Sequence, residues 1–423
     1  MNNRVVITGM GVAAPNGVGL GDFGNSIKNG ISGIHLIGEL QRLNFSCCIG
    51  GIPPVTDALT AKYLSPLQLR NFNSSGILYG IIAGTDAWKD AGFTVNSESP
   101  PDYDTGIIFG TGTSGVDKFR EAIYQVDANN VKRLGSTVVI QTMASGISAY
   151  LGGILGLGNQ VTTNSSACTT GVEAILMAYE RIQAGKAKRM LAGSCSDQGP
   201  YIWGGFDAMK VMTYKHNETP EKGSRPMSSS ASGFVPGSGA GALLLESLES
   251  ALERKAEIYA EVLGGAVNSG GQRAGGTLTA PNAEAVQRCI SDAMANAGIE
   301  PGEIDAINGH LTATTKDALE IENWTKALQR SGKNFPYINS LKSMVGHCLA
   351  AAGSIESIAA VLQLKEGFIF PNINCEDLHP GILNLIDETK IPRELLKKEV
   401  NILAKASFGF GDVNGCIIFK KYN

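Results

Sequence analysis

Short apolar runs alternate with longer segments of helical periodicity along the chain. The apolar runs predict strands at residues 4–8, 105–109, 160–163, 189–192 and 241–246, and again at 260–264, 306–308, 402–404 and 416–419. The longer segments predict helices at residues 63–91, 171–184, 283–297, 317–328 and 354–364. Strands that alternate with helices are typical of a layered α/β fold in which the helices pack on the sheets.

A charged helical segment near residue 250 marks a join between two halves. It covers residues 246–255 (ESLESALERK) and is followed by strand-like residues 258–264. We therefore divide the chain into an N-terminal half, residues 1–252, and a C-terminal half, residues 253–423. A length of 423 residues suits two units, because single domains typically hold roughly 100–200 residues.

Composition narrows the class of protein. Charged residues make up 17% of the chain, against roughly 25% in typical globular proteins. So low a fraction favours a large compact body or an oligomer with a wide buried interface. The net charge of −4 gives no basic field that would recruit nucleic acid.

The cellular compartment is predicted from several sequence features. The N-terminus shows no signal-peptide pattern, and no apolar run approaches the roughly 18 residues of a membrane span. The eight cysteines form no CxxC pair, so we expect reduced thiols in a cytoplasmic protein.

A glycine-rich segment at residues 110–115 (GTGTSG) fits the GxGxxG pattern of dinucleotide-binding proteins. That pattern also needs an acidic residue at a strand end about 20 residues later. Asp127 lies instead in a polar segment. We therefore favour a loop that passes close to other backbone or lines a pocket.

Cys168 lies at a predicted strand-to-helix turn, in the segment 164–171 (NSSACTTG). Free N–H groups at a helix N-terminus favour the thiolate, so we expect a lowered thiol pKa. A backbone amide beside the sulfur could also stabilise an oxyanion. Cys168 is therefore a candidate nucleophile, although a small buried cysteine remains the commoner role for this residue type.

Two of the five histidines lie in loops of small residues. His310 follows the predicted strand at 306–308, and His347 precedes a helix rich in alanine and glycine. One thiol and two imidazoles supply the groups needed for nucleophilic acyl transfer. A zinc site would need a fourth ligand at suitable spacing, and the sequence offers none, so we predict no metal.

Six ordered motifs together resemble one family. They are VVITGMGVAAPNG, SSACTTG, SRPMSSSASGFVPGSGAG, NGHLTATTKD, NSLKSMVGHCLAAAGSIE and KASFGFGDVNGCIIF. The chain resembles β-ketoacyl-[acyl-carrier-protein] synthases, the elongating condensing enzymes of the thiolase-like fold. Its Cys–His–His set distinguishes it from initiating enzymes, which use Cys–His–Asn, and from chain-length-factor subunits, which lack the cysteine.

The resemblance implies a fold, partners and a reaction. The fold is two similar halves, each with a mixed sheet, stacked in five αβαβα layers. The partners are an acyl carrier protein and a second synthase-like chain, identical or different, and no cofactor is expected. The reaction transfers an acyl chain to Cys168 and condenses it with malonyl carrier, with loss of CO2, to give a 3-oxoacyl product two carbons longer.

The resemblance also assigns residue roles. The N–H groups of Cys168 and Phe410 would hold the oxyanion, His310 and His347 would stabilise the enolate, and Lys342 would organise the histidines. The remaining roles are binding of the pantetheine arm by Thr312 and Thr314, gating by Phe408, Gly409 and Phe410, lining of the acyl pocket by Thr113 and Phe206, and carrier docking by Lys132, Arg133 and Lys210.

Several residues of this chain differ from the family pattern, and they bear on the metabolic pathway in which it works. Leu311 stands where the family has glycine, and Thr113 where fatty-acid enzymes carry a bulky aliphatic residue. Lys405 and Ala406 replace a Ser-Asn pair that helps to hold a monovalent cation in some relatives, while Asn308 and Glu356 remain, so we expect the Lys405 ammonium to replace the cation and pair with Glu356.

These departures favour secondary metabolism, of aryl-polyene or polyketide type, over housekeeping fatty-acid synthesis. The alternatives left open are a housekeeping enzyme, a non-catalytic partner subunit and a degradative thiolase that uses a late cysteine such as Cys416.

Overall fold

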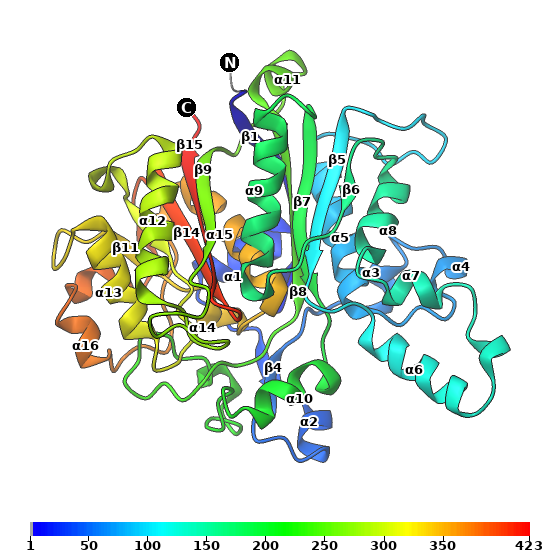
Figure 1. The fold of residues 1–423 in the computed structure, drawn as a ribbon, viewed down its shortest axis with the longest axis horizontal. Helices are drawn as coiled ribbons and strands as arrows, with labels where there is room; N and C mark the ends of the chain where they lie inside the picture. The colour runs from blue at the N-terminus through cyan, green and yellow to red at the C-terminus, as the bar shows by residue number, and fades with distance from the viewer. Residues whose placement is uncertain (1–2) are drawn as a thin grey trace.

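The computed structural model describes residues 3–423, and in it the two halves of the chain repeat one arrangement of five strands (Figure 1). The first half holds β1 (Val5–Ala14), β5 (Thr105–Thr111), β6 (Val161–Thr162), β7 (Arg189–Ser196) and β8 (Gly239–Ser247), in the spatial order β1-β8-β7-β5-β6. The second half holds β9 (Ala260–Ser269), β10 (Ala306–Asn308), β11 (Tyr337–Asn339), β14 (Ile402–Gly409) and β15 (Val413–Lys421), in the order β9-β15-β14-β10-β11.

Strand directions repeat as well. In each half the first two pairings of that order are antiparallel and the last two are parallel. The two sheets meet through a short antiparallel pairing of Val5, Val6 and Ile7 on β1 with β9. The predicted α/β fold of two similar halves with mixed sheets is confirmed.

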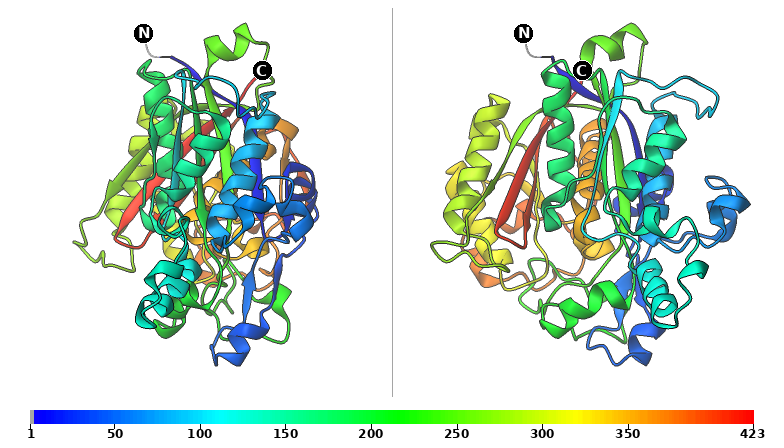
Figure 2. Two further views of the ribbon diagram at one scale, coloured as in Figure 1. Left: turned by 90° about the vertical axis from the view of Figure 1, so that its right-hand side faces the viewer. Right: turned by 45° about the vertical axis from the view of Figure 1, so that its right-hand side comes forward.

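Helices form the other three layers (Figures 1 and 2). α9 (Thr170–Gln183) and α15 (Ala352–Glu366) lie between the two sheets. The outer faces are covered by α5 (Ser75–Asp90) and α8 (Gly146–Leu155) on the first sheet, and by α12 (Ala283–Ala297) and α13 (Asp317–Leu328) on the second. The predicted order of five layers is therefore present.

The central helices pack very closely. Residues 352–364 of α15 are buried without interruption, as expected for a helix enclosed on every side. A Cβ on Gly171 of α9 would lie 2.4 Å from the backbone nitrogen of Ser354 on α15. Only glycine permits this approach, which fixes the start of α9 against the start of α15.

The glycines at 110–115 serve packing. A Cβ on Gly110 would lie 2.2 Å from Cγ2 of Thr170, and Gly115 has a φ of +60° with the Gln141 carbonyl oxygen 2.0 Å from the position of a Cβ. The segment thus passes close to neighbouring chain, as the favoured reading of the sequence predicted.

The predicted helix over residues 63–91 is wrong. The chain forms a short α4 (Pro66–Leu69), and α5 begins only at Ser75. Arg70 is extended and Asn71 has a φ of +60°, a conformation that no α-helix contains. Apolar positions on both sides of the break keep a helical spacing, and the prediction gave too little weight to the turn-forming residues 71–76 (NFNSSG) between them.

The remaining helices and strands are shorter or more peripheral. They are β2 (Gly17–Val18), α1 (Leu20–Lys28), β3 (Ile34–Leu36), α2 (Gly38–Arg42), β4 (Ile49–Gly51), α3 (Asp57–Thr60), α6 (Val116–Asp127), α7 (Val138–Thr142), α10 (Pro200–Ala208), α11 (Leu248–Glu253), α14 (Lys342–Val345), β12 (Phe368–Ile369), α16 (Pro380–Leu383) and β13 (Leu396–Lys397). Among the described residues, no helix combines the length and apolarity needed to cross a bilayer.

Candidate active site

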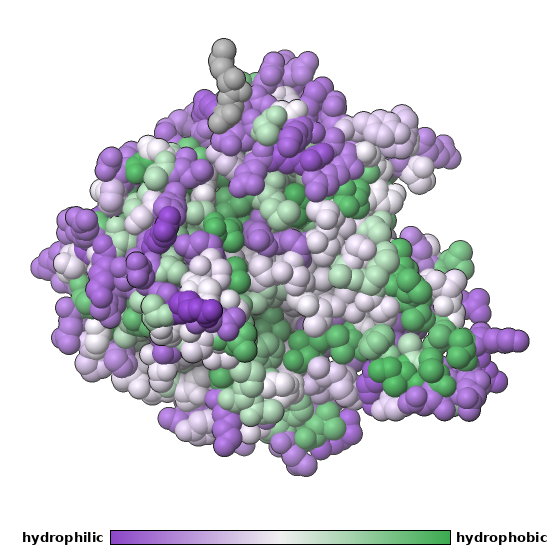
Figure 3. Space-filling model, in the orientation of Figure 1, coloured by the Kyte–Doolittle hydropathy of each residue, from purple (hydrophilic) through white to green (hydrophobic). Residues whose placement is uncertain are grey.

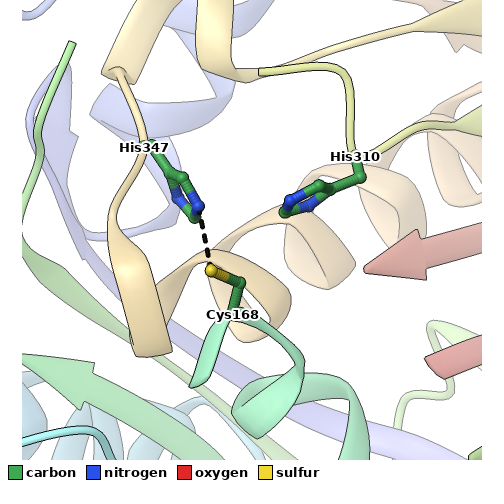
Figure 4. Close-up of side chains that lie close together, drawn as sticks. All are labelled: Cys168, His310 and His347. Carbon is green, nitrogen blue, oxygen red and sulfur yellow. Dashed lines mark hydrogen bonds between the residues drawn. The ribbon is translucent and has the colours of Figure 1, made fainter. Parts of the chain in front are cut away.

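The repeated topology brings Cys168 and His347 to the same end of the central layer. Cys168 lies in a 3-10 turn (Ala167–Thr169) between β6 and α9. His347 precedes the corresponding turn (Leu349–Ala351) between β11 and α15 in the second half. His310 follows β10 and completes the group (Figure 4).

The three side chains meet at close range. Nε2 of His347 lies 3.1 Å from Sγ of Cys168, and the two imidazole rings lie 5.3 Å apart at 84°. The backbone N–H of Leu349 donates to Nδ1 of His347 at 3.2 Å. Because Nδ1 accepts, Nε2 carries the proton and donates it toward the sulfur.

Both imidazoles are neutral in this environment. Burial lowers the pKa of His310 and of His347 well below 6.5, and the positive charge of Lys342 lowers both pKa values further. Nδ1 of His310 is buried without a hydrogen-bond partner among the described residues. Two neutral rings with free N–H capacity can stabilise negative charge that develops on a bound substrate.

The thiol of Cys168 is harder to ionise than the sequence suggested. Burial raises its pKa to about 11, although the charge of Lys342 and the backbone N–H groups of Phe410 and Cys168 lower it. The expectation of a lowered pKa is therefore wrong, because desolvation of the anion outweighs the helix N-terminus. The residue rests as a thiol.

Two backbone donors flank the sulfur. The backbone N–H groups of Cys168 and Phe410 are close enough to the sulfur to lower its pKa. A Cβ on Gly409 would lie 3.1 Å from the backbone nitrogen of Cys168, so glycine lets β14 end this close to the nucleophile. Paired N–H groups in such a position suit an oxyanion hole.

Two buried lysines share one buried glutamate beneath the site. Nζ of Lys342 lies 2.5 Å from Oε1 of Glu356, and Nζ of Lys405 lies 2.9 Å from Oε2 of the same carboxylate. Lys342 therefore acts on the histidines by its charge, while its ammonium is bound by Glu356. Asn308, on the neighbouring strand, donates to Oδ1 of Asn339 at 3.1 Å.

A cavity of about 400 Å³ opens from Cys168 to the surface. The predicted substrate-binding residues Phe206, Thr312 and Thr314 line it, as do Phe408, Gly409 and Phe410 of the predicted gate, and Lys210 lies exposed at its rim. The hydroxyl oxygens of Thr312 and Thr314 lie 3.1 Å apart. The cavity suits an extended arm with amide groups.

Several predicted residues lie outside this cavity, in addition to the buried Lys342, Asn308, Glu356 and Lys405. Thr113 is exposed and does not line it in the single chain, contrary to its predicted place in the acyl pocket. Lys132 and Arg133 are also exposed, on a 3-10 turn (Val131–Arg133) that follows α6. Cys416, the alternative late cysteine, is fully buried within β15.

Two acidic residues were missed by the sequence analysis. Glu320 accepts the backbone N–H groups of His310 and Leu311 at 2.6 and 2.7 Å, and Asp317 accepts that of Thr312 at 3.0 Å. Burial raises the pKa of Glu320 to about 7 and that of Asp317 to about 6. Their signal was the DxxE spacing in the first turn of α13, directly after the histidine loop.

A metal ion is a poor fit for this group of residues. The ligand atoms of Cys168, His310 and His347 all lie within 4.8 Å of one another, which is close enough to share an ion. The neighbouring charge of Lys342, which already lowers both imidazole pKa values, would repel a cation there. The donor set suits a nucleophile with two hydrogen-bond donors better.

Comparisons with known proteins agree with this arrangement. The "Beta-ketoacyl synthase, N-terminal domain" matches residues 2–251, and the "Beta-ketoacyl synthase, C-terminal domain" matches residues 259–376. The chain is 34% identical to 3-oxoacyl-[acyl-carrier-protein] synthase 1 of Haemophilus influenzae, over 99% of both chains. It is 33% identical to the corresponding synthase 1 of Escherichia coli, again over 99% of both.

Solved structures with the same fold agree with this family assignment. One is a type II polyketide acyl-carrier protein in complex with its ketosynthase bound to the hexaketide, with a TM-score of 0.88, 28% identity and 100% of both chains covered. Another is the ishigamide ketosynthase/chain length factor, with a TM-score of 0.88, 26% identity and full coverage of both chains. The chain belongs to the β-ketoacyl synthase family and is a condensing acyltransferase, a 3-oxoacyl-[acyl-carrier-protein] synthase.

Proposed function

We propose that this synthase elongates acyl chains of a specialised pathway in two steps at Cys168. In the first step the sulfur attacks an acyl thioester on the pantetheine arm of a carrier protein. The tetrahedral oxyanion accepts the N–H groups of Cys168 and Phe410. When the intermediate collapses, the carbon–sulfur bond to pantetheine breaks and the proton of Cys168 leaves with the pantetheine thiol.

The second step forms the carbon–carbon bond. A malonyl thioester enters the cavity and loses CO2. The electron pair of the broken carbon–carbon bond stays on the remaining thioester, which becomes an enolate. The N–H groups of His310 and His347 stabilise the enolate oxygen. The carbanion then attacks the acyl carbon on Cys168, and the released sulfur takes up a proton. Decarboxylation supplies the nucleophile, so no external base is needed.

The observation that carries this proposal is the 3.1 Å contact between Nε2 of His347 and Sγ of Cys168. It joins the two halves of the chain in one site and orients an N–H group at the point where both reactions occur. An intact cysteine with two histidines disfavours a non-catalytic partner subunit, and the burial of Cys416 disfavours the thiolase alternative.

The pathway proposal rests on the departures from the family pattern. Leu311 is fully buried in the loop that follows His310, with a φ of +21°, so this loop takes an unusual path beside the Thr312–Thr314 part of the cavity. Similarity to ketosynthases of polyketide assembly supports specialised chemistry, whereas the fatty-acid synthases among the relatives keep the housekeeping alternative open. A reducing cytoplasm suits a reaction that depends on a free thiol.

Exposed surfaces suggest where partners bind. Figure 3 shows apolar residues gathered over the region of α6 and α7, where Phe119, Ile123 and Val139 are exposed. We place a second synthase-like chain, identical or related, on this face, because β6 also ends the sheet there. Lys132, Arg133 and Lys210 remain our proposed contacts for an acidic carrier protein.

Intact-protein mass spectrometry tests the proposed reaction. Incubation with acyl carrier proteins that bear saturated, polyunsaturated or aryl chains is expected to add one acyl group to the wild-type protein. Cys168→Ala should remain unloaded, and Cys48→Ala should load normally. Wild-type protein that stays unmodified with every donor would refute the proposal, and preference for saturated chains would point to housekeeping synthesis.

A further inference from the structure

Lys405 is an unusual residue to find inside a protein core. It stands on β14 with no exposed surface, and Glu356, which it reaches from α15, is 1% exposed. Unpaired lysine is almost never buried so completely. Its position next to the catalytic cluster therefore needs a reason.

The surroundings of Nζ favour the ammonium form. Oε2 of Glu356 lies at 2.9 Å, Oγ of Ser407 at 3.2 Å, and the carbonyl oxygen of Ala406 is a third neighbour. An ammonium can donate to Ala406 and Ser407 while its charge pairs with Glu356, whereas a neutral amine has no charge for the pair. Burial lowers the pKa of Lys405 below its ordinary value, the charge of Glu356 opposes this lowering, and the charge of Lys342 adds to it.

The charge count beneath the site depends on this residue. Lys342 and Lys405 carry two positive charges against the single negative charge of Glu356. These three groups carry one net positive charge among them next to Cys168, His310 and His347, and the carboxyl of Glu320, at the backbone N–H of His310, is the other acidic group that acts on Lys405. Both steps of the proposed reaction build negative charge at that place, and a buried positive charge stabilises it more strongly than a solvated one.

Lys405 also reaches the oxyanion donors through the backbone. It contacts Ala406 and Ser407, the residues that lead along β14 to Phe410. The hydroxyl of Thr169, next to Cys168, donates to the carbonyl oxygen of Val413 at 3.1 Å and lies 3.5 Å from that of Ser407. The ammonium thus braces β14, the strand that leads to one donor, and β14 itself contacts the turn that carries the other.

We propose that Lys405 is a positioning residue of the condensing site, whose fixed ammonium balances Glu356, keeps the buried cluster at a net charge of +1 and braces the strand leading to the N–H of Phe410. This inference rests on the proposed function. It accounts for the second buried lysine without requiring any ion to bind.

The test compares four proteins by the rate of acyl loading on Cys168: wild type, Lys405→Met, Glu356→Gln and the double variant. Lys405→Met removes the charge and the brace on the strand that leads to the N–H of Phe410. It should slow loading by about 10²-fold, the loss expected when a group at the reaction centre is misplaced. The double variant restores the net charge of +1 through Lys342 and should load at least tenfold faster than Lys405→Met. Lys420→Met, an exposed change on the adjacent β15, is the matched control and should load normally.

A further variant separates the effect of losing the charge from an effect on folding. Lys405→Gln keeps donors for Ala406 and Ser407 but no charge, and its thermal melt shows whether it folds. Slow loading by folded Lys405→Gln supports the charge role. Wild-type loading by folded Lys405→Gln, or a double variant no faster than Lys405→Met, overturns the proposal. Loading of the wild type reports the proposed function separately, so failure of one is distinguishable from failure of the other.

Discussion

The ionisation of Cys168 provides the sharpest test of the site's electrostatics. Burial raises the thiol pKa from 9.0 to about 11. Because one pKa unit corresponds to about 1.4 kcal/mol, the protein disfavours the thiolate by about 3 kcal/mol relative to a free cysteine. At pH 7 roughly one sulfur in 10⁴ is then ionised.

Alkylation measures this fraction directly. The rate of iodoacetamide modification of Cys168, followed by peptide mass spectrometry, should rise about tenfold per pH unit from pH 6 to pH 10 without a plateau. Lys342→Met removes a charge that lowers the thiol pKa, so modification should be slower than in the wild type at each pH. Lys365→Met, on the surface side of α15, is the matched control.

The raised thiol pKa also determines how the stability of the folded protein changes with pH. A thiol whose pKa is raised on folding favours the folded state below about pH 9, and this contribution is lost as the pH rises through about 11. A plateau in the alkylation profile below about pH 9 would refute the reasoning. Faster modification of Lys342→Met would do the same.

Three other perturbations follow from the geometry. His310→Ala should load Cys168 nearly as fast as the wild type but lose condensation by at least 10²-fold, as shown by product mass spectrometry, since the proposed mechanism assigns His310 to the enolate. Gly409→Ala places a Cβ 3.1 Å from the nitrogen of Cys168 and should slow loading about tenfold or more, while the thermal melt stays close to that of the wild type. Lys132→Glu together with Arg133→Glu should raise the KM for the carrier protein and leave kcat nearly unchanged; an unaltered KM would remove these residues from the docking surface.

Periodicity predicted the sheets well because both are buried on two faces. The largely apolar runs at residues 189–192 and 402–404 form the first part of β7 and of β14, where helices cover each side. The break before α5 was not predictable in the same way. It depends on the backbone of Asn71, whereas the apolar positions on either side keep a helical spacing.

The nucleophile and its histidines could be recognised from motifs, but their protonation could not. A turn before a helix suggested a lowered thiol pKa, and the sequence did not reveal that desolvation of the sulfur would outweigh the helix N-terminus. The proton of His347 depends on the N–H of Leu349, a residue whose φ of +51° no spacing rule anticipates. Burial and backbone direction are properties of the assembled layers.

The repeated halves explain why one site forms from distant segments. Each half places a 3-10 turn at the N-terminal end of a central helix, after the outermost parallel strand of its sheet. One turn carries Cys168, and the other follows His347. Close contact between α9 and α15, which Gly171 permits, brings these two turns together. Since Lys342, Glu356 and Lys405 all belong to the second half, the charge in the proposed mechanism comes from one half and the proposed nucleophile, Cys168, from the other.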